Sequence, residues 1–332
     1  MQPTKSPAKK KRTAITRLAQ MMNRRLLIQL LCFAVIGLLM FLGWLYSTQG
    51  ERFYLIPLSD WVNTGVDWLI INLAVVFDGI KYATAFVLNN FEKFLLWLPW
   101  WAVLVLTALI AWRVAGYRVV IFSILALYFI GTLGLWDLCM STLALIATAV
   151  IISVVIGIPV GILSARSDRM DNIVRPILDA MQTMPAFVYL IPALMFFGIG
   201  KVPGVIATVI FALPPAVRLT NLGIRQVPRE LVEAAQAFGS TSRQLLLKVQ
   251  FPLALPSIMA GVNQVIMLAL SMVVLAAMIA AGGLGREVFM ALGQVDAGRG
   301  FAAGTAIVLV AMILDRVTQS LAKKRKGMIK AA

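Results

Sequence analysis

The amino-acid sequence predicts an all-α polytopic membrane protein, with about eight transmembrane helices and both termini in the cytoplasm. Of the 332 residues, 61% are hydrophobic, and the mean hydropathy is +0.90, which a soluble domain would not sustain. Several apolar runs reach about 20 residues, enough to cross a bilayer core as a helix. The expected spans lie near residues 26–46, 96–112, 118–136, 138–163, 177–199, 203–222, 252–281 and 301–319.

The distribution of basic residues sets the orientation of these spans. The chain has 30 Lys and Arg against 14 Asp and Glu, a net charge of +16. With the spans above, 24 of the 30 basic residues fall on one side of the membrane. Such asymmetry is typical of the cytoplasmic side. The charge therefore indicates topology, and no nucleic-acid partner is expected.

The N-terminal region is predicted to contain a basic cytoplasmic tail and a retained membrane anchor. Residues 1–25 are rich in Lys and Arg, and the apolar run 26–46 follows. This run exceeds the ~7–15 residues of a cleaved signal sequence, and no A-x-A cleavage site follows it. The tail is expected to lie on membrane lipid with anionic headgroups.

Residues 47–95 are predicted to form a periplasmic amphipathic segment. Apolar residues recur in steps of three and four over 60–95, with charged residues largely on other faces. A spanning helix would bury several charges, at about 2.5–3.5 kcal/mol each. The segment should therefore lie flat on the outer surface or pack on the bundle, and Asp78-Gly79 is the expected position of any break. The alternative is a ninth span at 68–77, which is too short to cross.

Two accessory helices over 96–137 are expected to precede a transport core at 138–320, and a basic cytoplasmic tail at 321–332 follows. Gly, Pro and small polar residues interrupt the apolar runs of this core, as in helices packed closely around a pathway. Polar side chains on two spans are candidates for lining it, and their alternative role is to hold helices together. The candidates are Gln182, Thr183, Asn263, Gln264 and Ser271.

Several absences limit the chemistry of the chain. It has no histidine, and Cys32 and Cys139 both lie in apolar surroundings with no pairing pattern. The sequence also lacks a G-x-x-x-x-G-K-[ST] phosphate loop, and ionisable residues are scarce at membrane depth. We therefore predict no catalytic residues, no metal site and no bound cofactor, and an energy source outside this chain.

Residues 228–252 form a short amphipathic unit between two apolar runs. Pro228 suits the start of a helix, and Leu231, Ala234, Ala235 and Phe238 share one face. Gly239 is suited to end that helix in a left-handed conformation. The pair Thr241 and Gln244 then matches a capping box that begins a second helix.

The spacing of this unit resembles the EAA loop of ABC importer permeases. That pattern reads EAA, three residues, Gly, nine residues and I-x-L-P, and here it is Glu233-Ala234-Ala235, Gly239 and Val249-Gln250-Phe251-Pro252. In that family the loop is a coupling helix that docks on a separate ATPase subunit. The alternative is an amphipathic helix lying on the bilayer or on its own bundle. The resemblance implies ATPase contacts for Glu230, Glu233, Ala234, Ala235, Phe238, Gly239 and Arg243.

Longer segments are similar to the permease subunits of glycine betaine/proline osmoprotectant importers. The segments are PAFVYLIPALMFFGIGKVPG, IFALPPAVRLTNLGIRQVP and IMAGVNQVIMLALSMVV, within a likeness over about 55–320. The resemblance implies a type I ABC importer fold in the bacterial inner membrane. It also implies a second copy of the chain, two ATPase subunits that carry ATP and Mg, and a periplasmic or lipid-anchored binding protein. The implied substrates are betaines of the glycine betaine/proline type, with proline betaine, choline or carnitine as alternatives.

Other interpretations remain open at this point. Residues 282–300 are expected to form an outer loop, either a docking surface for the binding protein or a plain flexible turn. A secondary carrier or channel working alone, and a scaffold or receptor using 60–95, are alternative functions. The basic clusters Lys9–Arg12 and Lys323–Lys326 either sense salt through anionic lipid or only anchor the topology.

Overall fold

The computed structural model describes residues 29, 31–42, 44 and 57–331, and all regular structure in these ranges is helical. The chain divides into two compact units, 1–69 and 70–332. The first contains an apolar helix at Leu31–Leu42 and most of α2 (Leu58–Asn72). The predicted anchor at 26–46 is therefore helical where it is described. The tail 1–25, with Lys9–Arg12, lies outside the described residues.

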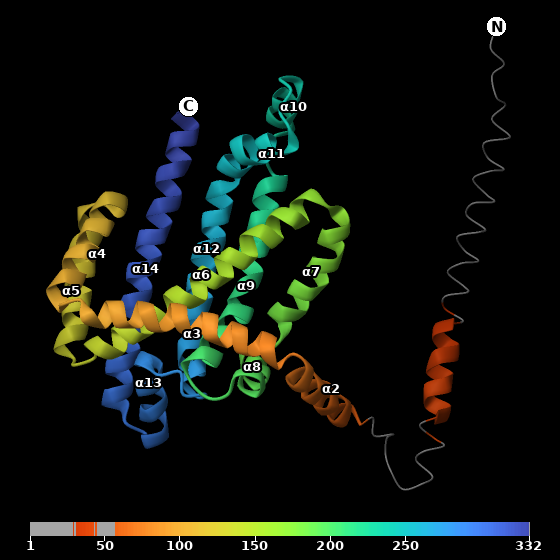
Figure 1. Ribbon diagram of the computed structural model, residues 1–332, viewed down its shortest axis with the longest axis horizontal. Coiled ribbons are helices and arrows are strands. Elements are labelled where there is room, and N and C mark those ends of the chain that lie inside the picture. Colours follow the sequence, from red (N-terminus) through yellow and green to blue (C-terminus); the bar gives the residue numbers. More distant parts are fainter. Residues whose placement is uncertain (1–28, 30, 43, 45–56, 332) are drawn as a thin grey trace. The chain divides into compact units, whose positions relative to one another are not determined.

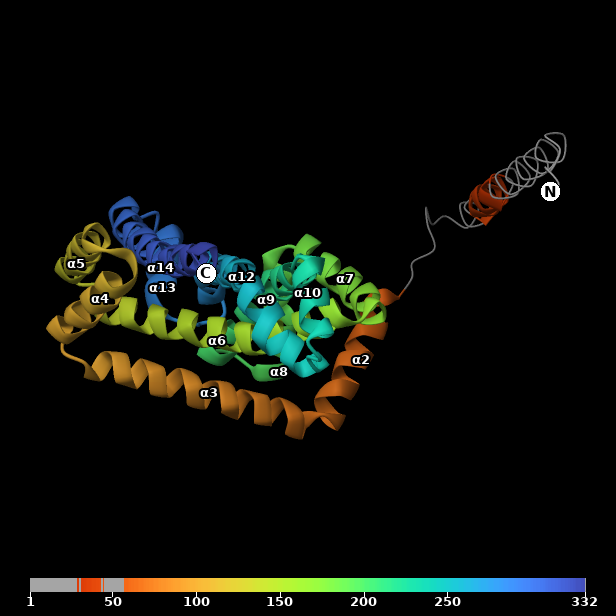
Figure 2. The ribbon, with the colours of Figure 1, turned by 90° about the horizontal axis from the view of Figure 1, so that it is seen from above.

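In the second unit, α3 (Ala74–Trp97) runs across the bundle and packs on α6, α8 and α9 (Figures 1 and 2). Leu88 is buried in this contact. The predicted break near Asp78-Gly79 is wrong, because the helix is interrupted at Leu73 and both residues lie inside α3. A glycine inside a helix costs only about 1 kcal/mol, which the packing of a 24-residue helix offsets.

The two accessory helices form a hairpin. α4 (Trp100–Ala115) and α5 (Tyr117–Thr132) meet at Gly116, whose positive φ of 86° suits glycine. Each has 16 residues, or about 24 Å at 1.5 Å per residue, which is less than the bilayer core of about 30 Å. Both helices pack against α14 (Ala297–Ala331).

The core consists of α6 (Trp136–Arg166), α9 (Lys201–Arg225), α12 (Phe251–Ala277) and α14. Among the described residues, four helical stretches are long and apolar enough to cross a membrane, or six if two interrupted pairs each count once. Eight spans were expected. The difference comes partly from α4 and α5, which are apolar but short. The expected span at 26–46 is described only in part.

Glycines bring α6 and α9 into close contact. A Cβ on Gly157 would lie 2.6 Å from Ala216 Cβ, and one on Gly161 would lie 2.6 Å from Thr220 Cβ. The two glycines are four residues apart and therefore share one helix face. This small-residue packing explains why the predicted core has glycines inside its apolar runs.

The predicted span at 177–199 is not one continuous helix. α7 (Asp168–Thr183) ends before Pro185, and the chain continues as the short 3₁₀ helix η1 (Ala186–Tyr189) and α8 (Leu190–Phe197), bent by 110° from α7. Met184 is extended, with ψ 135°, as expected for a residue before proline.

The outer segment 282–300 contains a helix and is not a plain turn. It contains α13 (Gly283–Gln294), whose Leu284 N–H donates to Thr142 Oγ1 at 2.8 Å. Gly285 is buried, and a Cβ there would lie 2.3 Å from the Val273 carbonyl oxygen. The flexible-turn interpretation is therefore wrong, because backbone contacts hold the start of this segment to α6 and α12.

Candidate functional site

The predicted coupling helix is α10 (Arg229–Ala237), which projects from one end of the bundle (Figure 1). It has no buried residue. Glu230, Glu233, Ala234 and Ala235 all lie within it. Phe238 follows at its end with 91% of its surface exposed. An amphipathic helix of nine residues is too short to be stable alone. Because its apolar face is exposed in this subunit, the face is a candidate docking surface for another protein.

Gly239 turns the chain after α10. Its φ is 75°, its N–H donates to the Gln236 carbonyl at 2.9 Å, and the Ser240 N–H donates to the Ala235 carbonyl at 3.1 Å. The predicted capping box is confirmed, because Thr241 and Gln244 exchange side-chain and backbone hydrogen bonds at the start of α11 (Ser242–Gln244). Both signals are local, which is why sequence spacing alone located them.

α11 continues without interruption into α12. The π-helical segment η2 (Leu245–Gln250) joins them, so a helix extends from Ser242 to Ile279. Arg243 lies in α11, at the start of this helix. Leu246 is buried against Ile224, Ala254 and Ile258. A displacement of this loop would therefore be transmitted directly to a core helix.

The loop is also tied to α6. Arg166, the last residue of α6, donates from a guanidinium nitrogen to the Ser242 carbonyl at 2.6 Å. The loop thus contacts the ends of α6, α9 and α12, and all three belong to the predicted transport core.

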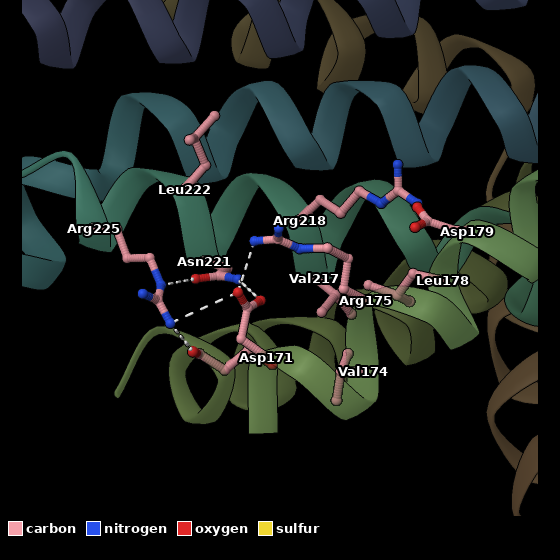
Figure 3. Close-up of a pocket in the computed structure, with 11 residues that line it drawn as sticks. Asp171, Val174, Arg175, Leu178, Asp179, Val217, Arg218, Asn221, Leu222 and Arg225 are labelled. Carbon is pink, nitrogen blue, oxygen red and sulfur yellow. Dashed lines mark hydrogen bonds and ion pairs between the residues drawn. The ribbon is translucent and has the colours of Figure 1, made fainter. Parts of the chain in front are cut away.

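A charged hollow of about 280 Å³ lies between α7 and α9 (Figure 3). Asp171 is 8% exposed and is at its centre. It accepts hydrogen bonds from Arg175 and from the Asn221 amide, both at 2.7 Å. Arg225 lies 3.8 Å from the same carboxylate and pairs with Asp168 at 2.9 Å. The carboxylate is buried but well supplied with donors.

Further contacts extend the network at both ends. Arg225 donates to the Ser164 carbonyl at 2.9 Å, and Arg218 pairs with Asp179. The buried Ser164 Oγ and Arg218 Nε have no hydrogen-bond partner among the described protein atoms. The network joins α6, α7 and α9 near the end that carries α10, where it resists separation of these helices.

Four of the predicted pathway residues are exposed on the surface of the subunit. Gln182 and Thr183 lie in the last turn of α7, and the Thr183 hydroxyl donates to the Ala180 carbonyl at 3.0 Å. Gln264 and Ser271 are exposed at positions i and i+7 of α12 and so share one face. The pathway role of these four side chains therefore stays a prediction.

Asn263 is placed differently. Its amide nitrogen donates to Asp315 Oδ1 at 3.1 Å, and its amide oxygen accepts from the Thr318 hydroxyl. It therefore joins α12 to α14. Asn263 therefore matches the alternative role considered for the polar core residues, which is to hold helices together.

Comparison with known proteins places the chain in one family. The model of the binding-protein-dependent transport system inner membrane component matches residues 157–327. The chain is 52% identical over 273 residues to the glycine betaine/proline betaine transport system permease protein ProW of Escherichia coli K12, covering 82% of this chain and 77% of that protein. The chain belongs to this family.

A second relative is the glycine betaine transport system permease protein OpuAB of Bacillus subtilis 168. It is 50% identical to this permease over 277 residues, which cover 83% of this chain and 98% of the relative. Among solved structures, the MetNI methionine ABC transporter in an inward-facing form matches 57% of the permease and 95% of its own chain, with a TM-score of 0.54 and 21% identity. That likeness supports the type I importer fold alone. The permease is a transport subunit of the inner membrane and not an enzyme.

Sequence reasoning missed the α7–α9 network of the permease, although its signal is present. Four charged residues of α7, Asp168, Asp171, Arg175 and Asp179, follow in steps of three, four and four. The polar residues Arg218, Asn221 and Arg225 of α9 follow in steps of three and four. Both sets occupy one face of their helix. Their pairing could not be foreseen, because it depends on the turn from α6 into α7.

Proposed function

We propose that this permease is the membrane-spanning subunit of an ATP-driven importer of glycine betaine and related betaines. The observation that carries the proposal is the identity of about one half to two glycine betaine permeases over more than four fifths of the chain. The relatives' names specify glycine betaine and proline betaine, and carnitine and choline remain as alternative substrates.

The complete importer in this proposal contains two copies of the permease, two ATPase subunits and a substrate-binding protein. ATP and Mg belong to the ATPase subunits. The exposed α10 supports the ATPase contact, because its apolar face has no partner within this subunit. The exposed faces of α7 and α12 support pairing with a second copy, around a pathway that includes Gln264 and Ser271.

The continuity of α11 and α12 suggests how the motion would be transmitted. Closure of the ATPase pair on ATP would displace α10 together with the turn at Gly239. The helix from Ser242 to Ile279 would move with it, and Arg166 would carry the displacement to α6. The bundle would change from inward-facing to outward-facing, and hydrolysis would reverse the change.

Co-purification and uptake test this function together. The permease is purified in detergent with the ATPase encoded beside it, and both are reconstituted with the cognate binding protein in proteoliposomes. We expect a stable complex and ATP-dependent uptake of labelled glycine betaine. Unlabelled proline betaine, carnitine and choline, each in excess, identify other substrates by competition.

The Glu233→Arg variant separates coupling from assembly. The charge reversal on α10 should abolish uptake and leave the protein in the membrane, because Glu233 is exposed and belongs to none of the ion pairs found among the described residues. Arg169→Glu is the matched control, since it reverses an exposed charge at the same end of the bundle. Full uptake by Glu233→Arg would contradict the coupling role. For the unmodified permease, a stable ATPase complex without betaine uptake would contradict the substrate and leave the importer function intact.

A further inference from the structure

A basic hollow of about 200 Å³ lies between the accessory helix α5 and the core helix α14. Its lining consists of Arg118, Val119 and Phe122 from α5 and Met312 and Arg316 from α14. The start of α5 and the C-terminal part of α14 lie toward the end of the molecule that carries α10 (Figure 1). The hollow is separate from the coupling loop and from the α7–α9 network.

The rim of the hollow is cationic and has no compensating carboxylate. Among the described side chains, neither Arg118 nor Arg316 forms an ion pair. Arg118 lies 5.8 Å from the centre of the Tyr117 ring and donates to the Tyr117 hydroxyl at 3.3 Å. The nearby carboxylate of Asp315 instead accepts from Asn263 and from Gln319. Two guanidinium groups are thus available to one anion.

The backbone adds to this positive potential. α5 begins after Gly116, and no side chain caps its first N–H groups. The N-terminus of a helix carries a partial positive charge, which favours an anion at this position. Arginine is suited to phosphate, because its planar fork donates two parallel hydrogen bonds.

The floor of the hollow is apolar. Phe122 lies one turn deeper than Arg118 along α5, and Met312 lies one turn deeper than Arg316 along α14. Beyond them, Ile121 and Leu125 continue α5 as an exposed apolar surface, 55% and 63% exposed. A charged rim above an apolar floor matches a headgroup joined to an acyl chain. A free phosphate would use only the rim.

We propose that this hollow binds one anionic phospholipid. Its phosphate lies between Arg118 and Arg316, and its acyl chain lies along Phe122 and Met312. The hollow lies toward the end of the molecule that carries α10, which contacts the ATPase in the proposed function. The assignment of the lipid to the cytoplasmic leaflet rests on that proposed function. The lipid would join α5 to α14 and so attach the accessory hairpin to the core. Basic hollows between transmembrane helices on this side are suited to such headgroups.

Native mass spectrometry of the full-length permease in detergent tests the proposal. The probe is dioleoyl phosphatidylglycerol, with dioleoyl phosphatidylcholine as the uncharged-headgroup comparison. We expect one phosphatidylglycerol adduct of distinctly higher affinity than any phosphatidylcholine adduct. In Arg118→Gln/Arg316→Gln its affinity should fall about 25-fold, because each arginine contributes about fivefold. Arg118→Lys/Arg316→Lys, which keeps the charge, should retain a weaker but measurable adduct.

Two controls identify the ligand and the site. Arg169→Gln removes an exposed charge at the same end of the molecule and should leave the adduct unchanged. An excess of glycerol 3-phosphate carries the same anion without acyl chains and should fail to displace the lipid.

Each contrary outcome overturns a stated part of the proposal. An unchanged adduct in the double glutamine variant, or equal losses in Arg169→Gln, would exclude this hollow. Full displacement by glycerol 3-phosphate would exclude a lipid in favour of a free anion. Because the readout is lipid binding and not uptake, none of these results depends on the transported substrate.

Discussion

Gly239 occupies a backbone conformation that other residues rarely adopt. Its φ is 75°, and nothing lies within 4 Å of the position that a Cβ would take. The glycine is therefore required by its conformation and not by crowding. It determines the direction in which the chain leaves α10 and enters α11.

We expect Gly239→Pro to abolish betaine uptake. Proline is held near φ −65° and has no N–H, so it would lose both the turn and the hydrogen bond to Gln236. Uptake in proteoliposomes and co-purification of the ATPase are the measurements. Gly239→Asn is the matched control and should retain most activity, because Asn tolerates the left-handed region. Normal uptake by the proline variant would refute the role of this turn.

Asp171 and Asp168 differ in burial although both pair with Arg225. The Asp171 side chain is 11% exposed and the Asp168 side chain is 87% exposed. Removing the charge of a buried pair leaves its partners without compensation, whereas an exposed pair contributes little. The two residues therefore provide an internal comparison.

We predict that Asp171→Asn lowers the free energy of unfolding by about 3 kcal/mol, against about 0–1 kcal/mol for Asp168→Asn. Thermal unfolding in detergent, followed by loss of the monodisperse chromatographic peak, measures the difference. Similar midpoints for the two variants would show that the hollow is hydrated enough to screen Asp171.

At the scale of helices, the packing of α6 on α9 is one of the two most extensive contacts of the core, together with that of α12 on α9. Gly161 faces Thr220 and the Val217 carbonyl oxygen, and Gly157 faces Ala216. Small residues on both surfaces let the two backbones approach, which is how helices associate in a lipid environment that supplies no hydrophobic force.

Gly161→Ala should destabilise the permease by about 1–3 kcal/mol, because the added Cβ would lie 2.6 Å from Thr220 Cβ and 2.7 Å from the Val217 oxygen. Gly304→Ala on α14 is the control, since no atom lies within 4 Å of its added Cβ. Alanine also favours a helix, so this control should be neutral or slightly stabilising. Thermal unfolding in detergent measures the difference. An unfolding midpoint of Gly161→Ala equal to or above that of the unmodified permease would contradict close packing at this position.

At the scale of the whole molecule, α7 presents its charged face to α9 and its apolar face outward. Met170, Ile173 and Ile177 lie on the outward face, with Ile173 and Ile177 62% and 54% exposed. The proposed second copy of the permease would cover this face. It adjoins Gln182 and Thr183 in the same helix, two of the predicted pathway residues.

We expect Ile173→Gln/Ile177→Gln to shift the detergent-solubilised permease from dimer to monomer. Each substitution places an amide at an apolar contact, where it has no partner. Light scattering after size-exclusion chromatography gives the mass. Ile121→Gln on α5, where the isoleucine is 55% exposed, should leave the mass unchanged. A dimer that survives the double change would assign the α7 face to lipid.

The sequence alone determined the helical membrane class, α10 with both its ends, and the family. These features depend on local information, namely apolar run length, the preference of Gly239 for positive φ, and the hydrogen bonds of Thr241 and Gln244. Each is complete within a few residues, so the rest of the chain hardly affects it.

Only the tertiary structure decided the interruption at Leu73 between α2 and α3, the bend at Pro185, the helix at Gly283–Gln294 and the partners of Asp171 and Asn263. Asp171 meets Asn221 across 50 residues of sequence, and Asn263 meets Asp315 across 52. Periodicity shows which face of a helix is polar, but not which distant helix it meets. That choice depends on how the glycines of α6 and the turn before α7 bring the elements together.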